Sequence, residues 1–267
     1  MINLFGILLG RIGPYYVNTH FVYGNENDAN ELLKFIDSML DKKVELPKAV
    51  FEKVINQYNN NRIYNDIINE TIDFIKSNID VTEIDYIAGG ERRDWLFSFI
   101  VAYILKKPHL TLFKDLSAVS SNFDFSETKV ANNLGGKKIL HIADLMNFGT
   151  SYIRSWIPAI QDLSGELVWS LVLVDRMQGG KKRLEDLGIK SFAIANIDTS
   201  LFELALNKGI INESQFKMIE KYIEDSDGTM KDFLLSHPNF LQDALNSDEK
   251  TAKRAKLLID GNLYGLN

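Results

Sequence analysis

Short apolar runs alternate with amphipathic stretches through the middle of the chain. The runs have the length and composition of buried parallel strands, and they cover residues 84–90, 110–113, 139–142, 166–174 and 190–197. Between them lie stretches with helical character, at 96–105, 152–163 and 181–187. Strands that alternate with helices in this way predict an α/β fold with a parallel sheet.

The segments before this series have other patterns. Apolar residues on one face predict helices at 26–40 and 62–79, and Pro47 is suited to open another helix within 44–61. Aromatic and β-branched residues predict a strand at 15–23.

From residue 199 onward the pattern is helical. We expect residues 1–207 to form the α/β domain and residues 208–267 to form a helical carboxyl-terminal extension. The pair Asp227 and Gly228 is expected to interrupt the helices of this extension.

Composition narrows the class of protein. The chain has 267 residues, a net charge of −6 and no cysteine, which argues against a general nucleic-acid-binding protein and excludes disulfides and thiolate metal sites. Its four histidines lack metal-ligand spacing. No apolar run approaches the roughly 20 residues that span a membrane. We therefore expect a soluble cytoplasmic protein without nucleic-acid or membrane partners.

The most informative stretch is 138–151, where a strand leads through an acidic residue and a turn at 145–148 to a helix. Asp144 stands at the carboxyl end of the strand, and Gly149, Thr150 and Ser151 precede the helix. Glycine lets the backbone approach a ligand, and the first amides of a helix are unpaired donors, so the unit suits a phosphate. A carboxylate suits sugar hydroxyls. The alternative is a helix N-cap after an ordinary buried strand.

This stretch resembles the phosphoribosyl-diphosphate (PRPP) signature of the type I phosphoribosyltransferases. In that family an apolar strand leads to two acidic residues and a loop rich in threonine and glycine. Asp144 matches the second acid, and residues 149–151 match the end of the loop that grips phosphate. The departures are Ala143 at the first acid, Asn147 at a usual threonine, and Phe148 for a small residue. The resemblance implies that the acid holds ribose hydroxyls and that the whole loop holds the 5′-phosphate.

A second resemblance lies at the end of the run 84–90. Gly89 and Gly90 close the strand, and Arg92 and Arg93 follow before a helix, in the order of the family's diphosphate-binding loop. A glycine pair permits close backbone approach, and two guanidinium groups offer many donors to a diphosphate. The alternative is a solvated basic turn with salt bridges to Glu91 and Asp94.

A third resemblance covers the region after 110–113. Lys114 matches a lysine of the orotate phosphoribosyltransferases, and residues 117–136 match their flexible catalytic loop. The segment is polar without a clear period, as in lids and disordered loops. The family's loop supplies lysine and histidine to the diphosphate. Here Lys129 is the only lysine of the loop, and no histidine occurs from residue 110 to 138.

Two more segments resemble the orotate enzymes. The pattern L-x-G-R-x-x-P-Y-Y-x-N places Tyr15 and Tyr16 at an aromatic pair beside the base, with Leu8 where the family has lysine. The run V-D-R-x-x-G-G implies that Arg176 contacts the base. The alternatives are core or dimer packing for the tyrosines and a strand-end Asp–Arg turn for the arginine. Compared with the family, an insertion is expected near residues 42–62.

Right-handed crossovers should bring the strand-end loops at Gly89, Asp144 and Asp175 to one edge of the sheet. The resemblance implies an enzyme of nucleotide metabolism, in pyrimidine biosynthesis if the base is orotate. It would transfer 5-phosphoribosyl from PRPP to a nucleobase such as orotate and release diphosphate. Mg²⁺ is implied as the cofactor, carried by PRPP rather than held directly by protein ligands.

The implied catalytic residues are Asp144 and the three cations Arg92, Arg93 and Lys114, which would stabilise the leaving diphosphate together with Mg²⁺. Two alternatives stay open. One is a regulatory protein that binds PRPP or a nucleotide without turnover. The other is an α/β protein for an unrelated phosphorylated ligand.

Assembly follows from the aromatic residues near the amino terminus. On an edge strand, Tyr15, Tyr16, Phe21 and Tyr23 would be exposed, so we expect them to meet a twofold partner in a homodimer. In the orotate enzymes the flexible loop of one subunit reaches the other's site. The alternative is that the carboxyl-terminal helices cover these residues.

Overall fold

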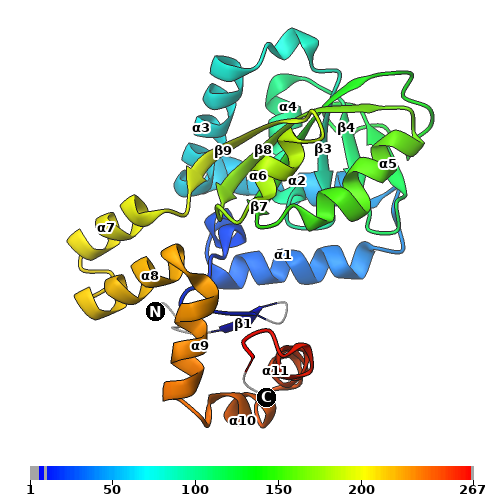
Figure 1. Ribbon diagram of the computed structural model, residues 1–267. Coiled ribbons are helices and arrows are strands. Elements are labelled where there is room, and N and C mark those ends of the chain that lie inside the picture. Colours follow the sequence, from blue (N-terminus) through cyan, green and yellow to red (C-terminus); the bar gives the residue numbers. More distant parts are fainter. Residues whose placement is uncertain (1–5, 9–10, 266–267) are drawn as a thin grey trace. The chain divides into compact units, whose positions relative to one another are not determined.

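Five parallel strands form the core of residues 19–197 in the computed structural model, which describes residues 6–8 and 11–265 (Figure 1). They belong to a seven-stranded sheet with the order β6-β5-β4-β3-β7-β8-β9. The parallel strands are β3 (Tyr86–Gly90), β4 (His109–Leu112), β7 (Lys138–Met146), β8 (Glu166–Asp175) and β9 (Lys190–Asn196). The predicted α/β fold with a parallel sheet is confirmed.

The alternating pleat of β7 sends its side chains into two separate cores. Leu140 and Ile142 pack in the larger one, whereas Ile139 and Ala143 pack in the smaller one. Burial on both faces explains why the strand appears in the sequence as a nearly continuous apolar run.

Helices cover both faces of this sheet (Figure 1). The helices that contribute to the larger core are α1 (Glu26–Met39), α2 (Leu46–Asn60), α3 (Arg62–Asn78) and α4 (Trp95–Leu105). Those that contribute to the smaller core are η3 (Tyr152–Trp156), α5 (Ile157–Asp162) and α6 (Gly180–Glu185). A short helical turn, η2 (Val81–Glu83), precedes β3.

Local signals explain where the first helices begin. The side chain of Asn25 accepts a hydrogen bond from the backbone of Asp28 and caps α1, and Asn61 does the same for Tyr64 in α3. Pro47 lies in the first turn of α2, as predicted. The eight residues from Trp95 to Ala102 are all buried, so α4 is apolar on every side.

One predicted boundary beside the site was wrong. The expected turn at 145–148 begins later, because Leu145 and Met146 still pair with Val174 and Asp175 of β8. The helix predicted at 152–163 is present, and its first part is a π-helical turn, η3, that continues directly into α5.

The predicted strand at 15–23 was also wrong. Residues 19–23 form a short 3-10 helix, η1 (Thr19–Tyr23), with no sheet partner. Tyr23 is buried in the larger core, 5.3 Å from the ring of Tyr64, and Phe21 packs partly against the same core. Tertiary packing thus overrides the strand propensity of these residues. The chain itself buries rings that were expected to need a partner subunit.

The predicted polar loop at 117–136 contains a β-hairpin instead. Strands β5 (Ala118–Ser121) and β6 (Thr128–Val130) pair in antiparallel fashion and extend the sheet beyond β4. Phe125, between them, is completely buried and stacks on Phe51 at 4.6 Å. This aromatic anchor explains how so polar a segment is ordered.

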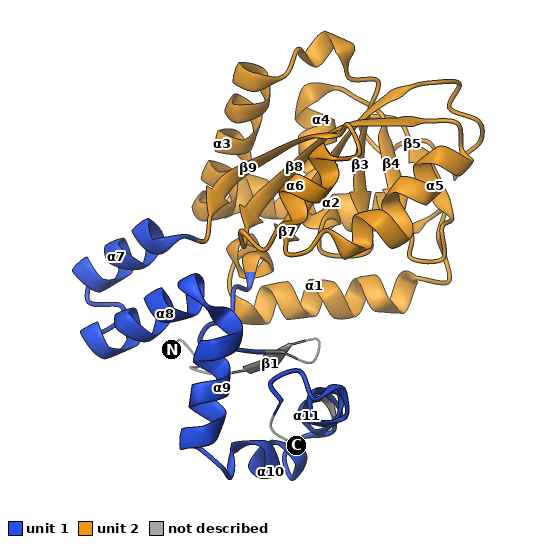
Figure 2. Ribbon diagram, in the orientation of Figure 1, with its two compact units in different colours: residues 1–18, 198–267 blue, residues 19–197 orange. Residues whose placement is uncertain are grey.

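The chain folds into two compact units, residues 19–197 and residues 1–18 with 198–267 (Figure 2). The seven-stranded sheet and its helices belong to residues 19–197, unit 2 in Figure 2. These limits differ from the boundary expected at residue 207, and the division into a domain of residues 1–207 with an extension, like the insertion near 42–62, stays a prediction.

Unit 1 in Figure 2, residues 1–18 with 198–267, is mainly helical, as predicted for the carboxyl-terminal region. It contains β1 (Gly6–Leu8), β2 (Arg11–Gly13), α7 (Thr199–Asn207), α8 (Glu213–Glu224), α9 (Ser226–Ser236), α10 (Phe240–Leu245) and α11 (Glu249–Gly261). The expected break at 227–228 lies inside α9, whose N-cap is Asp225. Within the described ranges, no helix is both long and apolar enough to cross a membrane.

Candidate functional site

The carboxyl ends of β3, β7 and β8 lie next to one another, because the three strands are adjacent and parallel. Ala88 pairs with His141, and Met146 pairs with Asp175. The glycine pair that ends β3, Asp144 near the end of β7 and the segment after β8 therefore share one edge of the sheet, as predicted. Ligands of open α/β sheets bind at such edges.

Close packing requires glycine at positions 89 and 90, the last two residues of β3. A Cβ on Gly90 would lie 2.2 Å from a ring atom of Trp156, and one on Gly89 would lie 2.2 Å from the hydroxyl of Ser98. Neither glycine has a positive φ. At the end of β3, the backbone of Gly90, rather than a side chain, therefore lies against the indole of Trp156.

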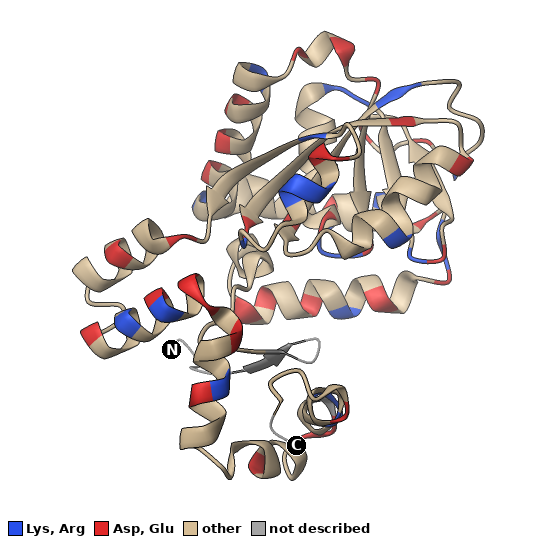
Figure 3. Ribbon diagram, in the orientation of Figure 1, with Lys and Arg blue, Asp and Glu red and all other residues tan. Residues whose placement is uncertain are grey.

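The three predicted cations of the site have different surroundings. Arg92 forms an ion pair with Asp37 of α1, a helix with mostly acidic charges (Figure 3), and donates to the carbonyl of Leu33 at 3.2 Å. Lys114 is exposed, and its Nζ lies 3.4 Å from a carboxylate oxygen of Glu91. The charge of Arg93 acts on Asp144 and on His20.

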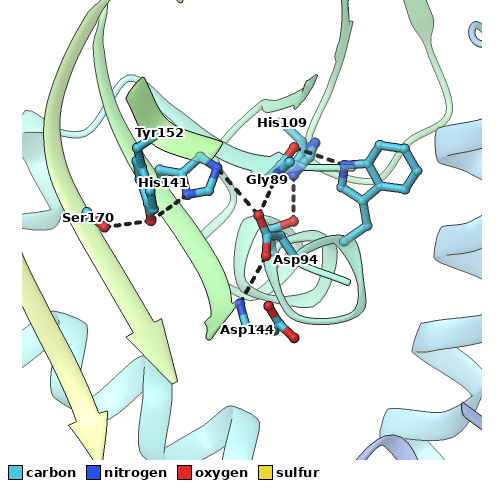
Figure 4. A network of polar contacts seen from close by, with 10 residues as sticks. Gly89, Asp94, His109, His141, Asp144, Tyr152 and Ser170 are labelled. Carbon is cyan, nitrogen blue, oxygen red and sulfur yellow. Dashed lines mark hydrogen bonds and ion pairs between the residues drawn. The ribbon is translucent and has the colours of Figure 1, made fainter. Parts of the chain in front are cut away.

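Asp144 is buried in a polar network that the sequence did not predict (Figure 4). Its carboxylate accepts a hydrogen bond from the hydroxyl of Thr19 at 2.7 Å, and its backbone N–H donates to Oδ1 of Asp94 at 3.0 Å. The backbone N–H of Gly90 donates to Oδ2 of Asp94 at 3.1 Å. The carboxyl group of Asp94 thus contacts the backbone of both β3 and β7 at the predicted site.

A chain of polar groups extends from Asp94 into the sheet (Figure 4). Nε2 of His141 lies 3.7 Å from Oδ2 of Asp94, longer than a hydrogen bond, and Nδ1 lies 3.0 Å from the hydroxyl of Tyr152. That hydroxyl lies 2.7 Å from Oγ of Ser170. The π-helical turn η3 supplies the tyrosine, and such turns are frequent at functional sites.

Burial controls the charges of this network. It raises the pKa of Asp94 well above the ordinary range, and the charge of Asp144 adds to the shift. Burial also raises the pKa of Asp144, although the Thr19 hydrogen bond and the Arg93 charge oppose this. Burial lowers the pKa of His141 to about 3, so its imidazole is neutral at physiological pH.

The predicted phosphate loop follows β7 directly. Gly149 has a φ of 66°, in the left-handed region, and the side chains of Thr150 and Ser151 are exposed. The carbonyl of Asn147 accepts from the backbone N–H of Gly180 at 3.0 Å, which fixes the loop against the start of α6. The loop therefore has a fixed base and exposed hydroxyls.

The remaining predicted residues lie in different places. Arg176 follows β8 at the shared edge and is half-buried, with its backbone N–H on the carbonyl of Met146 at 2.9 Å. Lys129 is exposed on β6, where it pairs with Ser120.

The predicted base-binding tyrosines belong to the other compact unit. Tyr15 is buried there, with ring centroids 4.8 Å from Phe202 and 5.8 Å from Tyr222, which fits the packing alternative. Tyr16 is half-buried. The side chain of Leu8 lies outside the described residues. The roles of these residues in base binding stay predictions.

Sequence reasoning missed Thr19, His20, Asp94, His141 and Tyr152. His20 is buried, and burial lowers its pKa to about 4, with the charges of Arg93 and then Arg92 adding to the shift. The available signal was a histidine inside the apolar run 139–142, because a polar residue in a buried strand needs partners.

Curated relatives of the chain are phosphoribosyltransferases. The orotate phosphoribosyltransferase of Sulfurisphaera tokodaii is 29% identical over 164 residues, which cover 60% of this chain and 77% of that enzyme. The orotate phosphoribosyltransferase of Sulfolobus acidocaldarius is 23% identical over 72% of this chain and 96% of its own length. The chain is similar in sequence to orotate and adenine phosphoribosyltransferases. The adenine phosphoribosyltransferase of Mannheimia succiniciproducens is 24% identical over 60% of this chain and 99% of that enzyme.

No family model matches the chain. Among solved structures, UMP synthase of Leishmania donovani is similar with a TM-score of 0.49 and 18% identity, over 63% of this chain and 34% of that one. The orotate phosphoribosyltransferase of Aeropyrum pernix is similar with a TM-score of 0.46 and 16% identity, over 75% of this chain and 90% of that one.

Proposed function

We propose that this phosphoribosyltransferase relative binds PRPP at the shared edge of β3, β7 and β8 and transfers its phosphoribosyl group to a nucleobase, with release of diphosphate. One observation carries the proposal. The glycine pair 89–90 at the end of β3 lies at the same sheet edge as Asp144 and the loop 147–151, because β3 and β7 are adjacent and parallel. Curated relatives named for orotate and adenine support transfer to a base without selecting one.

The 5′-phosphate is assigned to the loop 147–151. Thr150 and Ser151 are exposed and stand at the start of a helical segment, so their hydroxyls and the neighbouring amides are available as donors. Gly149 in the left-handed region brings the backbone to the ligand without a side chain in the way. Asn147 and Phe148 complete the loop.

Ribose hydroxyls are assigned to Asp144. In the structure this carboxylate accepts from the hydroxyl of Thr19, so it already binds a group of the same kind as a sugar hydroxyl. The charge of Arg93 favours the ionised form of the carboxylate and thus its role as an acceptor.

The diphosphate is assigned to the glycine pair 89–90 at the end of β3, together with the cations Arg92, Arg93 and Lys114. Arg92 and Lys114 are paired with carboxylates, and an incoming diphosphate would compete with these partners for the two cations. Mg²⁺ bound to PRPP would neutralise charge on the leaving diphosphate. Among the residues that the structure describes, no group of three or more His, Cys, Asp or Glu side chains could hold a metal ion.

The nucleobase is assigned to the neighbourhood of Arg176, and the roles of Tyr15 and Tyr16 in base binding stay predictions. Asp175 is buried and accepts from the backbone N–H of Met177 at 2.8 Å, which shapes the turn that carries the arginine. A planar guanidinium at this position suits a carboxylate or carbonyl on the base.

One observation favours a second candidate, a protein of the same fold that binds PRPP or a nucleotide without turnover. The segment predicted to be a flexible catalytic loop is an ordered hairpin, β5 and β6, anchored by the buried Phe125. It contains no histidine, and Lys129 is exposed on its outer strand. A fixed hairpin is a poor lid for a reaction that must exclude water.

The deciding experiment measures diphosphate release from PRPP and Mg²⁺ with a panel of bases that includes orotate, uracil, adenine and guanine. The proposed transferase releases diphosphate with at least one base, and Arg93→Ala lowers that rate at least tenfold. The control Arg62→Ala, on an exposed arginine that pairs with Asp66 on α3, leaves the rate unchanged. PRPP binding without diphosphate release on any base supports the second candidate instead.

A further inference from the structure

The hydrogen-bond ladder between β3 and β7 ends before the site begins. Its register covers three pairs, and the last is Ala88 with His141. Beyond it, the backbone N–H groups of Gly90 and Asp144 point to the carboxyl group of Asp94, at 3.1 Å and 3.0 Å (Figure 4). A side chain therefore replaces the ladder at the point where the two strands enter the proposed site.

A chain of buried polar groups lies behind Asp94. His141 presents Nε2 to Oδ2 of Asp94 at 3.7 Å, beyond hydrogen-bond distance, while Nδ1 contacts the hydroxyl of Tyr152 at 3.0 Å. If Ser170 donates to Tyr152 and Tyr152 donates to Nδ1, the proton of the neutral imidazole is on Nε2 and faces the carboxyl group. All four groups are buried, so the hydrogen-bonded atoms of His141, Tyr152 and Ser170 depend on one another for partners.

We propose that Asp94 is a positioning residue, which fixes the glycine pair at the end of β3 relative to Asp144 so that one phosphoribosyl ligand meets both. The inference rests on the proposed function, in which the glycine pair binds diphosphate and Asp144 binds ribose. The two parts of one ligand have a set separation, so both binding segments must be held at that separation before the ligand arrives.

Asp94→Asn tests this with little change in volume. Each carboxyl oxygen of Asp94 accepts from one backbone N–H, and an asparagine side chain has only one oxygen, so one of the two links must break. Loss of one buried hydrogen bond typically weakens an equilibrium about tenfold. We expect the Kd for PRPP with Mg²⁺ to rise at least about tenfold.

The matched control is Asp85→Asn at the opposite end of the same two strands. Asp85 accepts from the backbone N–H of Lys138 at 2.8 Å and pairs with Lys137 at 3.0 Å, so it links β3 to β7 away from the site. This variant should lose thermal stability but change the Kd for PRPP by less than about threefold. A purely structural role for Asp94 would make the two variants behave alike.

A spectroscopic readout separates positioning from general loosening. In the wild type, ¹⁵N NMR of His141 should show a neutral imidazole with the proton on Nε2, and saturating PRPP should shift its signals. If Asp94→Asn does not fold, Tyr152→Phe is measured in its place. This variant removes the hydroxyl that contacts Nδ1 of His141 and keeps the aromatic ring of residue 152. It should also raise the Kd for PRPP.

Calorimetric titration of PRPP and Mg²⁺ gives the decisive comparison. A larger loss of affinity in Asp94→Asn than in Asp85→Asn supports the inference. Equal affinity of Asp94→Asn and wild type, or equal losses in both variants, overturns it while leaving the proposed function intact. A wild type that binds no PRPP overturns the proposed function and, with it, this role of Asp94.

Discussion

Replacement of Gly90 by alanine tests the packing on which the proposed site depends. The added Cβ would lie 2.2 Å from Cε2 and 2.3 Å from Cζ2 of Trp156. Ordinary contacts of this kind begin at 3.4 Å, so the ring must retreat by 3.4 minus 2.2, or about 1.2 Å. Because φ of Gly90 is not in the left-handed region, alanine adds no backbone strain, and the whole effect is steric.

The indole has little room to retreat. Trp156 is only 3% exposed, and it stacks on the ring of His141 with centroids 6.2 Å apart. Overpacking of a core typically costs about 1–3 kcal/mol, and a fully enclosed ring places this substitution at the upper end, about 3 kcal/mol. The free energy of unfolding from urea titration, monitored by tryptophan fluorescence and circular dichroism, measures the loss.

Gly135→Ala is the control within the same unit. No atom lies within 4 Å of its added Cβ, and its φ is 58°, so only backbone strain of about 1 kcal/mol is expected. A double-mutant cycle of Gly90→Ala with Trp156→Phe should show a coupling of at least about 1 kcal/mol. Equal losses for the two glycine variants, or an additive cycle, would refute the contact between the turn and the indole.

Three further outcomes are expected. Burial lowers the pKa of His141 to about 3 from an unfolded value near 6.5, so protons bind the unfolded state and stability falls as the pH drops through this window. Between pH 6 and pH 4 the wild type should lose about 2.5 kcal/mol more than His141→Gln in urea titrations, and parallel pH profiles would contradict this. Ile68→Ala, at a fully buried site of α3, should cost about 2–5 kcal/mol in the same assay, and a loss below about 1 kcal/mol would argue against its burial. Light scattering should give the mass of two chains at micromolar concentration if the predicted homodimer exists, and a mass near one chain would exclude it.

The central sheet was predictable because its strands are buried on both faces. Such strands give nearly continuous apolar runs, as in β7 and β8, and the caps and Pro47 mark the helices between them. The hairpin β5–β6 was not predictable, because its strands have four and three residues and its anchor, Phe125, lies in the turn. Residues 19–23 were predicted to be a strand but form a helix, because their aromatic rings pack in the larger core and not on a sheet.

The site was predictable only where a motif was local. Gly89, Gly90 and Asp144 stand at strand ends, and topology alone brings them to one edge. Asp94 was considered only as a salt-bridge partner, because its partner Asp144 is 50 residues away in the sequence. The link between His141 and Tyr152 depends on a π-helical turn that no pattern indicated.

Thermal unfolding with and without PRPP tests the central claim most directly. At about 100 times its Kd, PRPP with Mg²⁺ should stabilise the protein by about 2.7 kcal/mol and raise the Tm by several degrees. Asp144→Ala should abolish the shift, while Asp124→Ala, in the exposed turn of the hairpin, should retain it. An unchanged Tm of the wild type at millimolar PRPP would contradict the assignment of this sheet edge as a PRPP site.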